Sequence, residues 1–194
     1  MIILLVVLAV IGFYLLVVYN KFVTTKTRIR ASIQEIGNQL KRQADLIPNL
    51  VDSVKGYMSH EKEIFTSLIE ARKTILEATA TNDPQMMVDA SAVAQRTLGK
   101  FQALMESTPE IKAVGAVTQL MGDLRDTADK IMYSRRVLID LSADYDIMVV
   151  TFPSNIVANI FHFTAEKGLV TPEEGEHLEV GGEEMKTPKV EMQG

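Results

Sequence analysis

The chain has 194 residues, which is enough for one helical domain with an added membrane segment and a tail. It contains no cysteine, which excludes a disulfide framework and a thiolate metal site. The formal net charge is −5, and the stretch from Thr171 to Gly194, with seven acids against two lysines, accounts for all of it. The remainder is neutral and lacks the basic footprint of a nucleic-acid-binding protein, so we expect no nucleic-acid partner.

Residues 1–19 predict a transmembrane anchor. Ile2 to Val18 reads IILLVVLAVIGFYLLVV without a single charge. About 17–19 residues with a rise of 1.5 Å each span roughly 26–28 Å, close to the thickness of the bilayer hydrocarbon core. A secretory signal peptide would need a positive n-region and a small-x-small cleavage site, and the stretch has neither. We therefore expect a single-pass helix that stays in the lipid bilayer.

The charges that flank the anchor predict its orientation. No lysine or arginine precedes it, whereas the juxtamembrane basic residues Lys21, Lys26, Arg28 and Arg30 follow it. By the positive-inside rule, the short N-terminus lies outside and the bundle and C-terminus are cytoplasmic. These four cations could also attract anionic headgroups, each contributing about 1 kcal/mol near the surface.

Apolar residues at helical spacing predict an elongated up-and-down four-helix bundle over residues 20–165. A first helix runs on from the anchor to about Ala44. Pro48 lacks an N–H and disfavours helical angles in the residue before it, so we expect Asp45–Pro48 to be a kink or a tight turn. A second helix then begins near Leu50 and ends near Asn82.

Restart signals delimit the remaining elements. Asp83 as N-cap and Pro84 at the first helical position begin a third helix, and Ser107 with Glu110 at capping-box spacing begins a fourth. The pair Phe152-Pro153 ends the fourth helix. A short amphipathic segment, 156–163, caps the bundle or lies against the membrane. The last segment, 166–194, predicts a disordered acidic tail, so the fold class is all-α.

Charged and polar residues interrupt the apolar stripes. Strict periodicity places Glu61 and Arg72 on the stripe of the second helix and Arg135 and Ser142 on that of the fourth. A buried charge without a partner costs several kcal/mol, so each must find a counter-charge or reach the bundle edge. One hypothesis pairs Arg72 with Asp123 or Asp126, and the alternative is that these side chains extend to solvent at the bundle edge.

No motif for catalysis or metal binding is present. His60-Glu61 begins an HExxH pattern, but position 64 is Ile, so the second zinc ligand is missing. Three histidines in all, with no glycine-rich phosphate loop and no nucleophile elbow, support no reaction. We therefore predict a non-enzymatic protein with no cofactor.

Several sequence blocks resemble the LemA family. They are Tyr19-Asn20-x-Phe22-Val23, Gln39–Arg42, Asp45–Val51, Val54–Tyr57, His60-Glu61 and Phe152–Asn155. Gln43, Leu138-Ile139 and Tyr145-Asp146 depart from the family's usual residues, so the chain resembles a divergent member, over about residues 1–165. The resemblance implies a prokaryotic protein of the cell (inner) membrane with a long helical bundle, and it implies no established activity.

The leading functional hypothesis is a membrane-tethered scaffold or adaptor whose cytoplasmic surface binds an unknown membrane-associated protein. Two alternatives are a self-assembling, membrane-shaping homo-oligomer and an envelope stress sensor with an extracytoplasmic bundle. If the first two helices are antiparallel, polar residues gather near the membrane-distal turn and could form a partner-binding end. The set is Asp45, Pro48, Asn49, Lys55, Tyr57, His60 and Glu61. The other interpretation is that Asp45, Pro48 and Asn49 only end one helix and begin the next.

Overall fold

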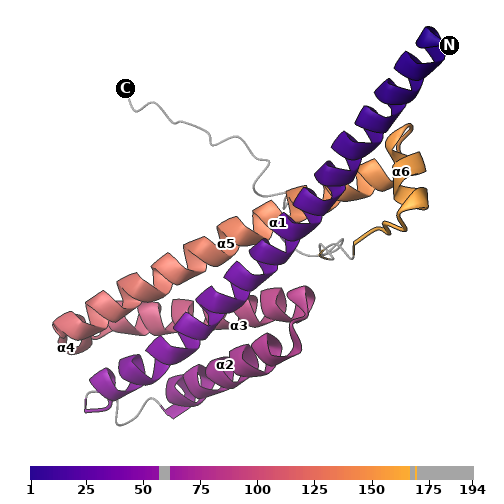
Figure 1. The fold of residues 1–194 in the computed structure, drawn as a ribbon. Coiled ribbons are helices and arrows are strands. Elements are labelled where there is room, and N and C mark those ends of the chain that lie inside the picture. Colours follow the sequence, from indigo (N-terminus) through magenta and orange to yellow (C-terminus); the bar gives the residue numbers. More distant parts are fainter. Residues whose placement is uncertain (57–61, 167–168, 170–194) are drawn as a thin grey trace, which may run out of the picture.

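The computed structural model describes residues 1–56, 62–166 and 169, and these residues form helices and no strand (Figure 1). The predicted all-α fold is therefore confirmed. Four long helices alternate in direction, and two short ones stand before and after the last of them. The helices are α1 (Ile2–Val54), α2 (Lys62–Thr81), α3 (Pro84–Ser107), α4 (Pro109–Lys112), α5 (Gly115–Val150) and α6 (Ser154–Ile160).

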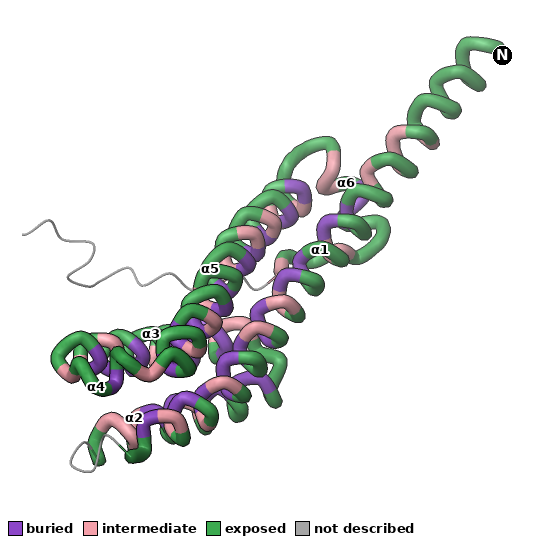
Figure 2. The backbone as a smooth tube through the Cα atoms, turned by 90° about the vertical axis from the view of Figure 1, so that its left-hand side faces the viewer, coloured by how far each residue is buried: buried purple, intermediate pink, exposed green. Residues whose placement is uncertain are grey.

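The core lies along the seam between α1 and α5 and continues between α2 and α3. α1 packs most extensively on α5, α2 packs on both α1 and α3, and α6 packs on α1 and α5. The predicted stripes of α1, α3 and α5 face this core (Figure 2). Its largest fully buried side chains are Tyr145, Phe22, Phe101, Ile36, Leu40, Ile47, Leu50, Leu68, Ile75, Ile111, Leu124 and Ile131.

The prediction of a turn at Asp45–Pro48 is wrong. α1 continues without interruption through Pro48 to Val54 and ends two residues before Gly56. Leu50 is therefore a buried residue of the first helix, and the second helix begins only at Lys62. In α2 the buried positions include Ala71 and Ala78, whereas Leu76 is exposed.

The reason α1 passes through Pro48 lies in α2, at Arg72, 28 residues from Ala44. Proline has no N–H, so the carbonyl of Ala44, four residues earlier, loses its helical donor. Arg72 Nε donates a hydrogen bond to this carbonyl oxygen over 3.0 Å. The guanidinium replaces the missing backbone donor, and the free carbonyl in turn satisfies a half-buried arginine. The helix therefore continues through Pro48, and Arg72 has a partner without an acidic side chain.

The start of α3 agrees with the sequence. α2 ends at Thr81, and Asn82 adopts a positive φ of 55°, a conformation that asparagine tolerates at helix C-termini. Asp83 Oδ1 then accepts hydrogen bonds from the backbone N–H groups of Gln85 (2.8 Å) and Met86 (3.2 Å). Asp83 is the N-cap and Pro84 follows it, as predicted.

The predicted capping box before the last long helix is wrong. Ser107 is the final residue of α3, and its hydroxyl donates to the carbonyl of Leu104 (2.8 Å) instead of accepting from a backbone N–H. A single turn, α4, follows, and Val114 in an extended conformation separates it from α5. The local hydroxyl–carbonyl bond competes with the cap, which is common for serine.

α1 carries the membrane anchor and the first bundle helix as one rod. It is the helix, among the described residues, that is long and apolar enough to cross a membrane, and no residue of its apolar window is buried. Figure 2 shows this segment exposed and projecting beyond the other helices. The 53 residues of α1 extend over about 80 Å, of which the anchor is roughly a third.

We expect Arg72→Met to destabilise the protein by about 1–3 kcal/mol, because it leaves the Ala44 carbonyl without a donor. In a Pro48→Ala background the same change should cost at least about 1 kcal/mol less, because position 48 then has an N–H for that carbonyl. Urea unfolding of the full chain in detergent, followed by far-UV circular dichroism, measures all four variants.

Arg96→Met provides the control for this double-mutant cycle. Arg96 Nε donates to the carbonyl of Ala92 within its own helix (3.3 Å), and the side chain is exposed. Its replacement should stay within roughly 0.5 kcal/mol in both backgrounds. Equal costs of Arg72→Met with and without Pro48 would show that the two residues are not coupled.

Asp83→Ala should lower the stability by about 1 kcal/mol, because it removes the side-chain acceptor for two backbone N–H groups at the start of α3. Asp144→Ala, at an exposed position inside α5, serves as the control. If both variants unfold at the same urea concentration, the cap does not contribute.

Candidate functional site

The predicted polar cluster lies along the membrane-distal end of α1. Asp45 and Asn49 are exposed there, Lys55 is exposed at the C-cap, and Pro48 is half-buried beside α2. The other predicted members, Tyr57, His60 and Glu61, lie outside the described residues. Because α1 has no turn at Pro48, the exposed members are spread along two to three turns of one helix.

The structure places the two arginines of the apolar stripes, Arg72 and Arg135, in different surroundings. Arg72 binds the Ala44 carbonyl, so the hypothesis of a pair with Asp123 or Asp126 is wrong. Those two acids instead face Arg42 of α1, at 3.8 Å and 3.7 Å. Arg135 is half-buried on α5, as the bundle-edge interpretation expects.

The Arg42 cluster is a surface feature. Asp126 also accepts a hydrogen bond from Lys130 Nζ (2.8 Å), which lowers the pKa of its carboxyl below the usual value. Desolvation of the carboxyl acts in the opposite direction, and the charges of Lys130 and Arg42 add smaller contributions that also lower the pKa. All four side chains are about half exposed, where ion pairs contribute little to stability. The cluster joins α1 to α5 but does not form a reactive site.

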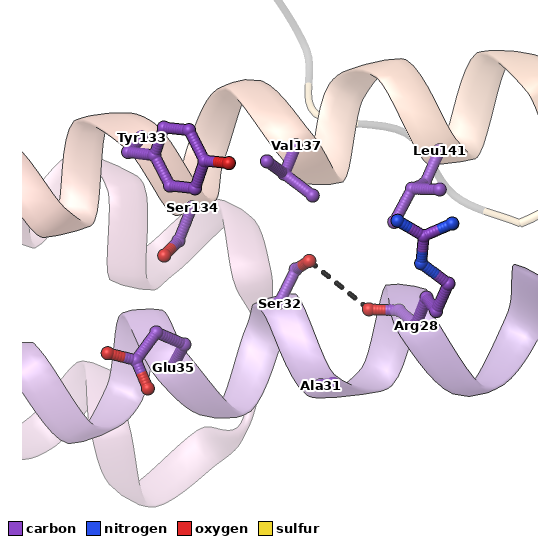
Figure 3. Close-up of a pocket in the computed structure, with 8 residues that line it drawn as sticks. All are labelled: Arg28, Ala31, Ser32, Glu35, Tyr133, Ser134, Val137 and Leu141. Atoms are coloured by element: carbon purple, nitrogen blue, oxygen red, sulfur yellow. Dashed lines mark hydrogen bonds between the residues drawn. The ribbon is translucent and has the colours of Figure 1, made fainter.

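An open groove lies between α1 and α5, and we call it the α1–α5 groove (Figure 3). It encloses about 260 Å³ and is mostly apolar. Tyr133, which is 72% exposed, forms one wall, and a neighbouring hollow continues from it toward Asp129. The groove is lined by Arg28, Ala31, Ser32, Glu35, Tyr133, Ser134, Val137 and Leu141.

The polar atoms of the groove are arranged around an apolar centre. Ser32 Oγ donates to the carbonyl of Arg28 in its own helix (3.1 Å), so its hydroxyl is already occupied. Glu35 accepts from Gln39 Nε2 (2.7 Å). Figure 3 shows Arg28 beside Leu141 at one end and Glu35 below Tyr133 at the other. The groove thus offers an apolar strip between opposite charges, which suits a helix or an extended segment of a partner.

Sequence reasoning did not identify the α1–α5 groove. The sequence signal for this groove is a set of small residues, Ala31 and Ser32 on α1 and Ser134 on α5, where the stripes of these helices otherwise carry large side chains. Small side chains leave a depression where larger ones would fill the space. Their alignment across two helices, more than 100 positions apart in the chain, needs the tertiary register.

The described residues contain no group of three or more histidines, aspartates or glutamates that could hold a metal ion. Among the residues lining the α1–α5 groove, the acid Glu35 and the hydroxyls of Ser32 and Ser134 have no histidine beside them. This geometry can bind an apolar segment but has no nucleophile–base pair for a reaction.

A second cluster joins the base of the anchor to the end of the bundle. The ring of Phe22 stacks on Phe163 (4.7 Å between centroids) and meets Tyr145 edge-on (5.5 Å). Burial of Tyr145 raises the pKa of its phenol above the usual value. Lys26 Nζ lies 5.9 Å from the centroid of the same ring and forms an ion pair with Glu166 at 2.7 Å.

This cluster changes two predictions. Glu166 also donates its backbone N–H to Asp146 (3.0 Å), and Leu169 packs on the core, so the ordered part reaches beyond the predicted limit of residue 165. The rest of the predicted acidic tail, 167–168 and 170–194, lies outside the described residues. Lys26 is engaged by Glu166 and is therefore not a free cation for lipid headgroups.

The other juxtamembrane cations stand at different heights. Measured from Val18 along α1 at about 1.5 Å per residue, Lys21 is roughly 5 Å away, while Arg28 and Arg30 are roughly 15 Å and 18 Å away. The screening length in physiological salt is about 8 Å. Lys21 is thus the one of these cations placed to contact headgroups, and Arg28 lines the α1–α5 groove.

Comparison with known proteins agrees with the fold and the sequence blocks. No curated protein matches the chain. The model of the LemA family matches residues 32–182, which cover most of the bundle and extend into the acidic segment, whereas the anchor lies outside the match. The expected coverage of residues 1–165 is corrected accordingly. Because the match covers more than half of the chain, the protein belongs to the LemA family.

Proposed function

We propose that this protein is a membrane-tethered, non-catalytic adaptor that presents the α1–α5 groove to a membrane-associated protein on the cytoplasmic side. The observation that carries the proposal is the groove itself, which is apolar, open and bounded by Arg28 and Glu35. A partner segment with an apolar strip and matching end charges would fit it.

The anchor supports this role because it confines the groove to the membrane surface. A partner in the same membrane then meets the groove at a raised effective concentration, so that even a modest contact suffices. α1 is continuous from the anchor to the groove, and Arg28 lies about 15 Å from the end of the apolar stretch. The partner segment must therefore be close to its own membrane attachment.

The cytoplasmic placement rests on charge. Four cations follow the anchor within about a dozen residues, and a cluster of positive charge beside a membrane helix is typical of its cytoplasmic side. The folded contacts of Lys26 do not alter this argument, since orientation is set while the chain is being inserted. The resemblance to prokaryotic relatives favours the inner membrane.

Site-specific crosslinking tests the adaptor proposal. The chain has no cysteine, so Val137→Cys introduces a unique attachment point for a photo-crosslinker in the groove and leaves Tyr133 in place. Recovery of only lipids and the protein itself from the groove position would contradict the proposal.

A loss-of-binding variant makes the same test quantitative. Tyr133→Ala, with the crosslinker again at Val137→Cys, should lower the yield of the captured partner roughly tenfold, because removing an aromatic interface side chain costs about 1–2 kcal/mol. Tyr133 is exposed, so unchanged helix content and unfolding midpoint are expected for Tyr133→Ala. An unchanged yield would show that the partner does not use the groove.

Protease protection tests the orientation. Protease added to intact cells should leave the bundle and an epitope placed after Gly194 undigested, and should cleave both after the cells are opened. Digestion in intact cells would place the bundle outside the cytoplasm and favour the envelope-sensor hypothesis.

A further inference from the structure

The corner between α5 and α6 exposes a concentration of apolar side chains. From Ile147 to Phe161 the sequence contains no charged residue. Val157 and Ala158 of α6 are fully buried, whereas Ile156 and Ile160 of the same helix are exposed. The exposed large residues, which we call the apolar corner, are Ile147 (58%), Val150 (72%), Phe152 (75%), Ile156 (47%), Ile160 (56%) and Phe161 (47%).

The apolar corner is fixed beside the inner end of the anchor. The ring of Tyr19 in α1 lies 4.8 Å from that of Phe161 and 5.7 Å from that of Phe163. Higher in the anchor, Tyr14 and Leu15 are half-buried because they pack against the core. Figure 1 shows α6 alongside the lower part of the projecting segment of α1, and Figure 2 shows the exposed turn between α5 and α6 there.

The length of the anchor sets the depth of this corner. The charge-free stretch of α1 ends at Asn20, so an anchor that spans about 30 Å of hydrocarbon has its inner boundary close to Tyr19. Tyr14 lies five residues further in, at roughly 7 Å. Interfacial helices insert their apolar face about 5–10 Å. Phe161, whose ring contacts that of Tyr19, stands at the inner boundary of the hydrocarbon and therefore within reach of this depth.

The charges near the corner are compatible with a lipid surface. Two acids near the corner, Asp146 and Glu166, already have partners. The Asp146 carboxylate accepts a hydrogen bond from the backbone N–H of Glu166, and the Glu166 carboxylate forms an ion pair with Lys26. Lys21, exposed at the level of the headgroups, supplies a positive charge. Both of these acids are therefore engaged within the fold.

We propose that the apolar corner inserts into the bilayer interface and forms a second lipid contact beside the anchor. A single helix can rotate and tilt freely in a membrane, but a helix with an attached apolar corner has one preferred rotation. The bundle is then held with a defined face toward the membrane and the α1–α5 groove at a fixed height. This inference depends on the anchor spanning the bilayer and is independent of which side the bundle occupies and of the adaptor role.

Lipid-borne quenchers test the insertion directly in the full chain. Phe152→Cys and Ile160→Cys, each labelled with an environment-sensitive fluorophore, are reconstituted in vesicles of phosphatidylcholine and phosphatidylglycerol. Phe13→Cys in the anchor is the positive control. Met132→Cys, equally exposed on α5 but about 27 Å from its C-terminal end, is the negative control. All four sites are exposed, so the substitutions leave the core intact.

Spin labels attached to the upper acyl chain should quench the fluorophores at positions 152 and 160 by roughly twofold, as they do at position 13, and leave position 132 unquenched. Quenching at 13 but not at 152 and 160 would overturn the proposal. A third outcome is that the fluorophores at 152 and 160 are shielded from water, are not quenched by lipid, and lie close to those of a neighbouring molecule. This outcome would assign the corner to a second copy of the chain and would also overturn the proposal.

Discussion

The packing of α1 along α5 depends on α1 remaining one uninterrupted helix. Pro48 removes a backbone donor in the middle of the membrane-distal third of this helix, beside the buried residues Ala44 and Ile47. The Arg72 guanidinium supplies the donor from α2, so the helix continues and carries Leu50 and Val54 into the core. A break at Pro48 would detach those side chains, and with them the contact between α1 and α2.

An unbroken α1 also couples the bundle mechanically to the membrane. The apolar anchor and the buried stripe from Phe22 onward belong to the same rod, with no linker between them. Phe22 is enclosed by rings from α5 and from the segment after α6, and the Lys26–Glu166 ion pair closes the same region. The orientation of the rod in the bilayer thus fixes the orientation of the bundle, unlike in proteins whose anchor and domain are joined by a flexible chain.

The two surfaces that we assign to partners follow from this coupling. We propose the lipid interface as the place of the apolar corner because Phe161 packs on Tyr19 of the anchor, and the water side as the place of the α1–α5 groove because it begins near Arg28. The charged groups between them are mostly engaged with one another at the surface. They give the bundle solubility and alignment, and the apolar surfaces provide the binding energy.

Much of the architecture could be read from local patterns. The charge-free stretch up to Asn20, the apolar spacing of α3 and α5, and the Asp83-Pro84 start of α3 depend on residues close in the chain, and each agrees with the structure. The turn at Pro48, the capping box at Ser107 and the Arg72–acid pair were wrong. In each case a hydrogen bond that local pattern does not specify replaced the expected one.

The sequence by itself determined an all-helical chain with a membrane anchor and a family resemblance, because hydrophobic periodicity and capping act over a few residues. Only the tertiary structure decided that Pro48 lies inside a helix, that the α1–α5 groove exists, and that the exposed residues of α6 lie level with the inner end of the anchor. Each of these depends on how side chains distant in sequence meet, Arg72 with Ala44, Ser32 with Ser134 across the groove, and Phe161 with Tyr19. The register between packed helices sets such meetings, and no local pattern encodes it.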